Sequence, residues 1–120
     1  MNYVPEENTI YPNIAVSTQS GVVFLQESEI LYCEADGSYT HIHLEDVEKS
    51  KLTVAKPLRR VLETLCETYF VRIHHSYAIN LLHAVSFNGV VKNCVSMTNG
   101  ENIAVSRSRK EAFLKRFKVL

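Results

Sequence analysis

The chain has 120 residues, 46% of them hydrophobic, and 13 basic residues balance 13 acidic ones to give a net charge of zero. This length and composition fit one globular domain with a hydrophobic core. No apolar run approaches the roughly 18 residues of a membrane-spanning helix, and the acidic first ten residues lack the apolar core of a signal peptide. We therefore expect a cytoplasmic protein that does not bind membranes. The three cysteines are odd in number and lack CxxC spacing, so reduced core thiols are expected rather than disulfides.

The charges are divided unevenly along the chain. Residues 1–50 hold one basic and nine acidic residues, a net charge of −8, whereas residues 51–120 hold twelve basic and four acidic residues, a net charge of +8. Six of the last fourteen residues are lysine or arginine, against the single acidic residue Glu111. An electropositive region of this kind is what a polyanion needs, so nucleic acid remains a candidate partner. A solvated basic helix at the end of the chain would explain the same charges.

The first half of the chain predicts a series of short strands. Residues 1–12 contain two of the three prolines and show no periodicity, which is typical of a linker or arm. Alternating segments then predict a hairpin around Ser20-Gly21 and further strands, with a turn at Asp36-Gly37. The expected strands are Asn13–Ser17, Val22–Gln26, Glu29–Ala35, Tyr39–Leu44 and Lys51–Ala55.

A helix is expected to follow these strands. Pro57 suits the first turn of a helix because its fixed φ is helical and its missing N–H is not needed there. One apolar stripe at i, i+3, i+4 and i+7 follows, made by Leu58, Val61, Leu62 and Leu65.

The stretch FVRIHHSYAINLL, residues 70–82, begins as an alternating strand and changes its pattern at Ser76. Ser76 is a good helix N-cap, and Ala78, Leu81 and Leu82 fall at helical spacing, so a short helical turn is predicted there. A strand that breaks into a helical turn would project the polar residues at the break toward solvent.

The last third of the chain predicts another hairpin and a closing helix. Asn88-Gly89 is a type I′ turn signal between strands at residues 83–87 and 90–97. A short strand at residues 103–105 precedes Ser106, which is expected to cap a helix that ends near Phe117. These patterns give about eight short strands and two or three short helices, a mainly β fold held by local hairpins.

Catalytic and metal-binding chemistry are disfavoured. His41 and His43 share one face of a strand and would form a zinc site with His74 or His75, but no carboxylate or thiolate stands at a familiar ligand spacing. Cys33 or Cys66 would need a histidine partner to act as a nucleophile, and their apolar surroundings favour buried, inert thiols. No glycine-rich phosphate loop is present. We expect neither an enzyme nor a cofactor.

Three clusters of residues suit a nucleic-acid ligand. They are the polar turn DGSYT at 36–40, the break at 74–80, and VSRSRK at 105–110, where a helix N-terminus and arginines would favour a phosphate. Arginine can also reach guanine edges, and asparagine can bind adenine through two hydrogen bonds. Each cluster is weak evidence alone, but all three occur together in one chain.

These segments, in this order, resemble the LytTR DNA-binding domain of bacterial response regulators. The resemblance rests on ILYCEADGSYTHIHL, a helix beginning PL, FVRIHHSYAINL, NG-type turns and VSRSRK, and it covers nearly the whole chain. It implies a domain over residues 13–120 with about ten short strands in small stacked antiparallel sheets. It also implies a transcriptional regulator whose loops read a direct-repeat site in successive major grooves of double-stranded DNA. A receiver domain before residue 1 and a dimer on DNA are implied as well.

The same resemblance assigns the contacts to DNA. Asn80 matches the family's contacting asparagine, and the expected arginine position is Ser108, so either Arg107 or Arg109 makes that contact. Lys56, Arg59, Arg60 and Arg72 are weaker candidates for phosphate contacts. The matched residues are Ser38, Tyr39, Thr40, His41, His74, His75, Asn80, Arg107, Ser108, Arg109 and Lys110. The alternative is a protein-interaction or sensory-output module with this fold that does not bind DNA.

Overall fold

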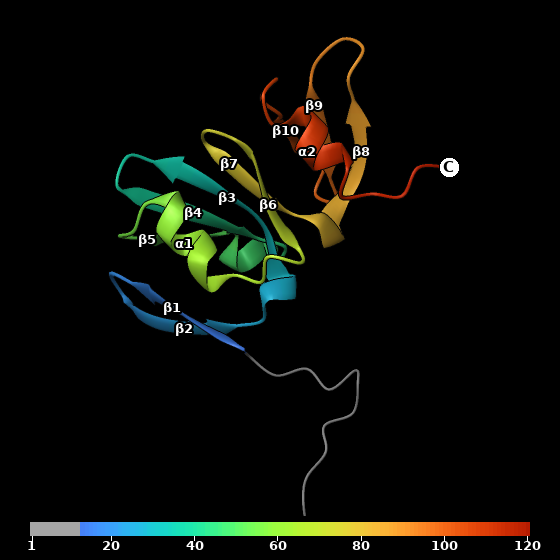
Figure 1. Ribbon diagram of the computed structural model, residues 1–120. Helices are drawn as coiled ribbons and strands as arrows, with labels where there is room; N and C mark the ends of the chain where they lie inside the picture. The colour runs from blue at the N-terminus through green and yellow to red at the C-terminus, as the bar shows by residue number, and fades with distance from the viewer. Residues whose placement is uncertain (1–12) are drawn as a thin grey trace, which may run out of the picture.

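The computed structural model describes residues 13–120, so the predicted linker at residues 1–12 lies outside the described part of the chain. Within residues 13–120 the fold is mainly β, with ten strands, two α-helices and three short 3-10 helices (Figure 1). The strands are β1 Ile14–Thr18, β2 Gly21–Leu25, β3 Ile30–Asp36, β4 Tyr39–Leu44, β5 Lys51–Val54, β6 Phe70–His74, β7 Tyr77–Asn80, β8 Ala84–Asn88, β9 Cys94–Met97 and β10 Asn102–Ala104. The helices are α1 Leu58–Thr64 and α2 Lys110–Leu114, and the 3-10 helices are η1 Glu27–Glu29, η2 Val47–Lys49 and η3 Leu81–His83.

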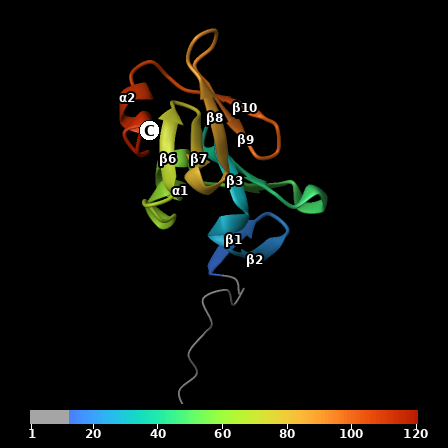
Figure 2. The ribbon, with the colours of Figure 1, turned by 90° about the vertical axis from the view of Figure 1, so that its right-hand side faces the viewer.

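The strands form three antiparallel sheets. A hairpin of β1 and β2 lies below a central sheet with the order β5-β4-β3-β7-β6, and a third sheet has the order β10-β9-β8 (Figures 1 and 2). In the central sheet β3 pairs with β4 on one side and with β7 on the other, although β7 lies more than 40 residues further along the chain. The predicted fold class, small antiparallel sheets with few helices, is confirmed.

One core fills the space between the central sheet, α1 and the β1–β2 hairpin. The apolar stripe of α1 faces inward through Leu58 and Val61 and continues in Leu65, as its helical spacing predicts. The hairpin contributes Val16 and Leu25 to this core. It therefore covers the α1 side of the sheet.

A second core joins the other side of the central sheet to β8–β10 and α2. A bulge in β3 breaks the alternation between Ile30 and Tyr32, so that Leu31 and Tyr32 both pack into this core. Phe113 of α2 and Ile73 of β6 are also fully buried here. Part of the central sheet is thus buried on both faces.

The helical turn predicted after Ser76 is wrong. Residues 77–80 form β7, which pairs with β3 and β6, and the helical segment that follows is only the 3-10 turn η3. The reason is that Ala78 packs into the first core and Ile79 into the second. A strand buried on both faces loses its alternation, and the apolar residues then imitate helical spacing.

Two further predictions are corrected at the end of the chain. The Asn88-Gly89 pair is not a two-residue turn, because β8 ends at Asn88, β9 begins only at Cys94, and Gly89 is not among the described glycines with positive φ. Ser106 does not cap a long helix. Its N–H donates to the carbonyl of Ile73 at 2.8 Å, and α2 begins only after Arg109.

The other predicted elements agree with the structure to within about two residues at their ends. The first hairpin, the strands β3 to β6, α1 and the turn at Asp36-Gly37 all form. Across residues 13–120, no helix is long and apolar enough to cross a membrane.

Candidate nucleic-acid interface

Backbone hydrogen bonds bring the three predicted contact segments to one end of the central sheet. The N–H of Ala35, near the end of β3, donates to the carbonyl of Ser76 in the β6–β7 turn at 2.8 Å, which sets the β3–β4 turn beside it. The bond from Ser106 to Ile73 fixes the segment before α2 against β6. The β3–β4 turn, the β6–β7 turn and residues 106–110 therefore follow one another across the molecule (Figure 1).

The β3–β4 turn exposes two of its four predicted contact residues. Gly37 adopts φ of +60° to close the turn, and Ser38 and Tyr39 are exposed. His41 is held in place: its Nε2 lies 2.9 Å from a carboxylate oxygen of Asp36, and its Nδ1 lies 2.8 Å from the Thr53 hydroxyl. Thr40 is completely buried, and its hydroxyl donates to the carbonyl of Lys56 at 2.7 Å. Thr40 thus anchors the turn and is not available to DNA.

The β6–β7 turn is clamped by an arginine. Arg72 donates from Nε to the carbonyl of His74 at 3.3 Å and from a terminal nitrogen to the carbonyl of His75. The N–H of Ser76 donates to Nδ1 of His74 at 3.0 Å, so this ring folds back onto its own turn. His75 is exposed. The turn is therefore held rigidly with His75 as its projecting side chain.

The third segment is the most basic. Arg107, Ser108 and Arg109 are exposed, and Lys110 lies over the ring of Phe87 at 5.6 Å from its centre. Burial and then the positive charge of Arg109 lower the pKa of Arg72, so the third segment and the clamped turn share one positive region. An anion bound here would relieve the repulsion between these cations.

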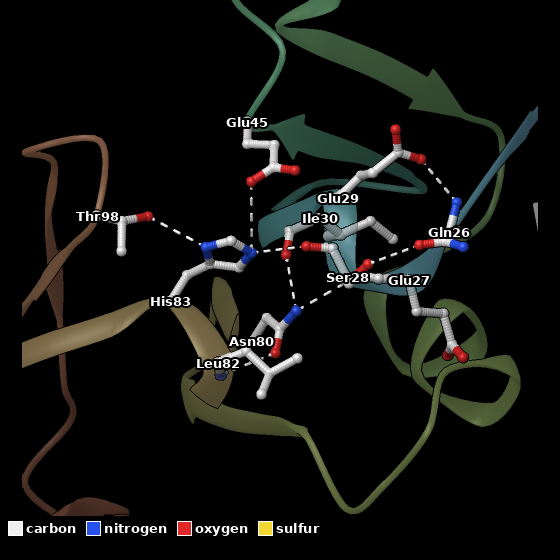
Figure 3. Close-up of polar contacts among 10 residues, drawn as sticks. All are labelled: Gln26, Glu27, Ser28, Glu29, Ile30, Glu45, Asn80, Leu82, His83 and Thr98. Carbon is white, nitrogen blue, oxygen red and sulfur yellow. Dashed lines mark hydrogen bonds and ion pairs between the residues drawn. The ribbon is translucent and has the colours of Figure 1, made fainter. Parts of the chain in front are cut away.

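Asn80 is fully buried and its amide is used inside the protein (Figure 3). Its Nδ2 donates to the carbonyls of Ile30 at 3.0 Å and Glu27 at 3.4 Å, and its Oδ1 accepts from the N–H of Leu82 at 3.0 Å. Both N–H groups of this amide are used and its oxygen is buried, so the amide does not face a base in this structure. We therefore assign Asn80 a structural role and leave it out of the contact surface.

His83 lies beside Asn80 and joins η1, the end of β4 and the β9–β10 turn (Figure 3). Its Nε2 donates to the carbonyl of Ser28 at 2.6 Å, just after the first hairpin, and lies 4.0 Å from Glu45, which follows β4. Its Nδ1 lies 3.1 Å from the hydroxyl of Thr98, in the β9–β10 turn. Its flanking sequence carries no periodicity or motif that would have revealed this role.

The residues considered for metal binding and nucleophilic catalysis have other partners. His41 and His43 share a face as predicted, but His43 pairs with Glu34 at 2.9 Å and stacks on Tyr32. Residues 13–120 contain no group of three or more His, Cys, Asp or Glu side chains placed to hold a metal. All three cysteines are free thiols, and burial raises the pKa of Cys33 to about 12, far from a reactive thiolate.

Sequence reasoning missed the clamp formed by Arg72, which was only a weak candidate for a phosphate contact. A clue was present in the spacing, because a long side chain two residues before a turn can reach the carbonyls of that turn. The exposed candidates that the structure brings together are Ser38, Tyr39, His75, Arg107, Ser108 and Arg109, with His41, His74 and Lys110 partly buried among them.

Known proteins of similar sequence and fold point the same way as this geometry. Residues 20–118 match the family described as the LytTr DNA-binding domain. The chain is 32% identical over 110 residues to the transcriptional regulatory protein LytR of Staphylococcus aureus strain N315, and 31% identical to LytR of strain MW2. Each alignment covers 88% of this chain but 41% of the relative, so the chain spans about two fifths of the length of these curated relatives.

A solved structure agrees with the match in sequence. The LytTr DNA-binding domain of a Bacillus cereus protein described as a methyl-accepting/DNA response regulator superposes with a TM-score of 0.74 at 25% identity. The superposition covers 88% of this chain and 96% of that domain. Together, the three-sheet fold, the family match over residues 20–118 and these relatives show that the chain belongs to the LytTr DNA-binding domain family.

Proposed function

We propose that this chain is the sequence-specific DNA-binding output domain of a bacterial transcriptional regulator of the response-regulator type. One observation carries the proposal. Three segments distant in sequence are hydrogen-bonded together at one end of the central sheet, where they expose arginines, short hydroxyl side chains and a histidine. These are groups that bind phosphates and base edges. The family to which the chain belongs supports the same conclusion.

The proposal divides the exposed residues by their chemistry. Arg107, Arg109 and Lys110 supply contacts to phosphates, which give the salt-dependent part of the affinity. His75 and one of the two arginines read base edges from the tips of their segments, and Ser38 and Ser108 add hydrogen bonds. The clamp of Arg72 and the buried hydroxyl of Thr40 hold the turns in place.

The arrangement of the segments suits a site longer than one helical turn. The β3–β4 turn and the segment before α2 lie on opposite sides of the β6–β7 turn. Segments at the two ends of this row would enter successive major grooves on one face of the duplex. Two copies on a direct repeat would bind more tightly than one through avidity, with dimerisation supplied by a receiver domain in the full protein.

The test is a binding-site selection from random duplexes, followed by affinity measurements from 50 to 300 mM salt. The proposal predicts an enriched direct repeat and a steep salt dependence, since several phosphates are neutralised on binding. Failure to enrich any sequence, with the chain also fused to a dimerising coiled coil, would reject sequence-specific binding. That result would favour an interaction module with the same fold.

A further inference from the structure

A cleft of about 530 Å³ lies between the β1–β2 hairpin, the strands β4 and β5, and α1. Its floor is apolar and belongs to the first core, with Val16, Ile42, Val54, Val61 and Leu65. Pockets that hold small molecules usually measure about 300–1,000 Å³ and combine an apolar lining with a few polar groups. This cleft has both the size and the lining of such a site.

The charge at the rim selects the kind of molecule. Lys56 is the only charged side chain among the described residues that line the cleft, and none of them is acidic. Lys56 is exposed, and none of the ion pairs among residues 13–120 includes it. A negative group on a ligand would therefore meet an unopposed cation at the rim and an apolar floor below it.

We propose that the cleft binds a small carboxylate with an apolar body, of the size of a medium-chain fatty acid, and that this ligand lowers the affinity for DNA. The second half of the proposal rests on the proposed function. The apolar body lies on Val54 and Val61, and the carboxylate pairs with Lys56.

The cleft is connected directly to the β3–β4 turn. Tyr39, an exposed residue of that turn, also lines the cleft. The hydroxyl of Thr40 donates to the carbonyl of Lys56, so the backbone that carries the cleft's cation is tied to the turn that faces DNA. A bound carboxylate neutralises Lys56 and places a negative charge beside the path of the phosphates. Both effects weaken DNA binding, and linkage requires that DNA weaken the ligand by the same factor.

The first experiment measures the site without DNA. Octanoate is titrated into protein labelled at the methyl groups of isoleucine, leucine and valine, and NMR spectra are recorded. The methyl signals of Val16, Val54 and Val61 should shift and saturate together. Those of Val95 and Ile103, which lie in the second core, should stay in place. Absence of saturable shifts at 5 mM octanoate would overturn the site.

Matched variants show whether the cleft itself is filled. Thr64→Trp and Ala55→Trp place a ring in the cleft from exposed positions and should weaken octanoate at least tenfold. Thr68→Trp makes the same change as Thr64→Trp at an exposed position outside the cleft lining and should leave the affinity within twofold. Equal affinities in the cleft variants and in Thr68→Trp would overturn the assignment.

The second experiment measures coupling to DNA. Saturating octanoate should weaken binding to the selected site at least fivefold in the original chain and less than twofold in Thr64→Trp. Octan-1-ol, which has the same chain without a charge, should bind the cleft but change DNA affinity less than twofold. Octanoate that binds without changing DNA affinity would overturn the coupling. If the protein does not bind DNA even in the absence of octanoate, the proposed function is rejected, and the NMR result on the cleft still stands.

Discussion

Asn80 offers a sharp test of the difference between a buried support and a DNA contact. Asn80→Ala removes an amide that bonds to the carbonyls of Ile30 and Glu27 and to the N–H of Leu82. Each buried polar group left without a partner costs about 1–3 kcal/mol. The carbonyl of Ile30 is deeply buried, whereas water can reach the N–H of the exposed Leu82. We therefore expect a loss of about 3 kcal/mol in the free energy of unfolding.

Asn88→Ala is the matched control. Asn88 also accepts a hydrogen bond from the backbone N–H two residues later, that of Val90 at 3.1 Å, but it is exposed. Its loss should cost about 0.5 kcal/mol, the usual size for an exposed position. The two variants thus share their chemistry and differ in burial.

Urea unfolding followed by circular dichroism measures both variants. With a slope of about 1.5 kcal/mol per molar urea, Asn80→Ala should lower the midpoint by about 2 M and Asn88→Ala by less than 0.5 M. The folded fraction of Asn80→Ala should keep its preference for the selected DNA site over random DNA. A midpoint within 0.5 M of the original, together with loss of that preference, would refute our account and return Asn80 to the contact surface.

Four further outcomes are expected. Lys110→Ala should weaken binding to specific and random DNA alike and reduce the slope of log affinity against log salt by about one unit. The control Lys115→Ala, at an exposed site in an ion pair with Glu111, should change the slope by less than about half a unit. Equal slopes in the two variants would place Lys110 outside the interface. His75→Ala should cost about 1–3 kcal/mol on the selected site and less on random DNA, and an equal loss on both would remove its role in base reading. Arg72→Lys should weaken the selected site about tenfold without changing the salt slope, because a lysine cannot reproduce the two directed bonds of the clamp; a slope reduced by one unit would show instead that Arg72 binds a phosphate. Burial holds the pKa of Cys33 near 12, above its ordinary value of 9.0. The free energy of unfolding should therefore fall as pH rises above about 9, where the unfolded thiol ionises and the folded one does not. Cys33→Ala should show a shallower fall with pH, and an equally steep fall in this variant would contradict the assignment.

Alternation predicts a strand most directly where one of its faces is buried. Tyr39–Leu44 has the bounds expected from its alternation, because Ile42 and Leu44 face the first core while His41 and His43 face away from it. Residues 77–80 were assigned wrongly because neighbouring side chains enter different cores. Local pattern cannot report a second core that is assembled from distant segments.

Local chemistry singled out the three candidate segments, but it did not show which of their side chains are buried. Asn80 follows a polar turn and has a side chain typical of a base contact. Its true partners, Ile30 and Glu27, lie 50 and 53 residues earlier in the chain. Thr40 is similar, since the carbonyl that fixes its hydroxyl lies 16 residues away. Both side chains are buried by contacts with distant parts of the chain, so in this structure they stabilise the fold instead of facing solvent.

The hydrogen bonds around His83 have a consequence for how the domain opens. A two-stranded ribbon or a small sheet has little stability of its own in water. His83 and Asn80 join η1, which follows the β1–β2 ribbon, to β3 of the central sheet and to the β9–β10 turn. The central sheet and the β8–β10 sheet should therefore exchange their amide hydrogens as one cooperative unit. A domain that opens only as a whole is stiff, and we expect it to keep its shape when it binds a ligand.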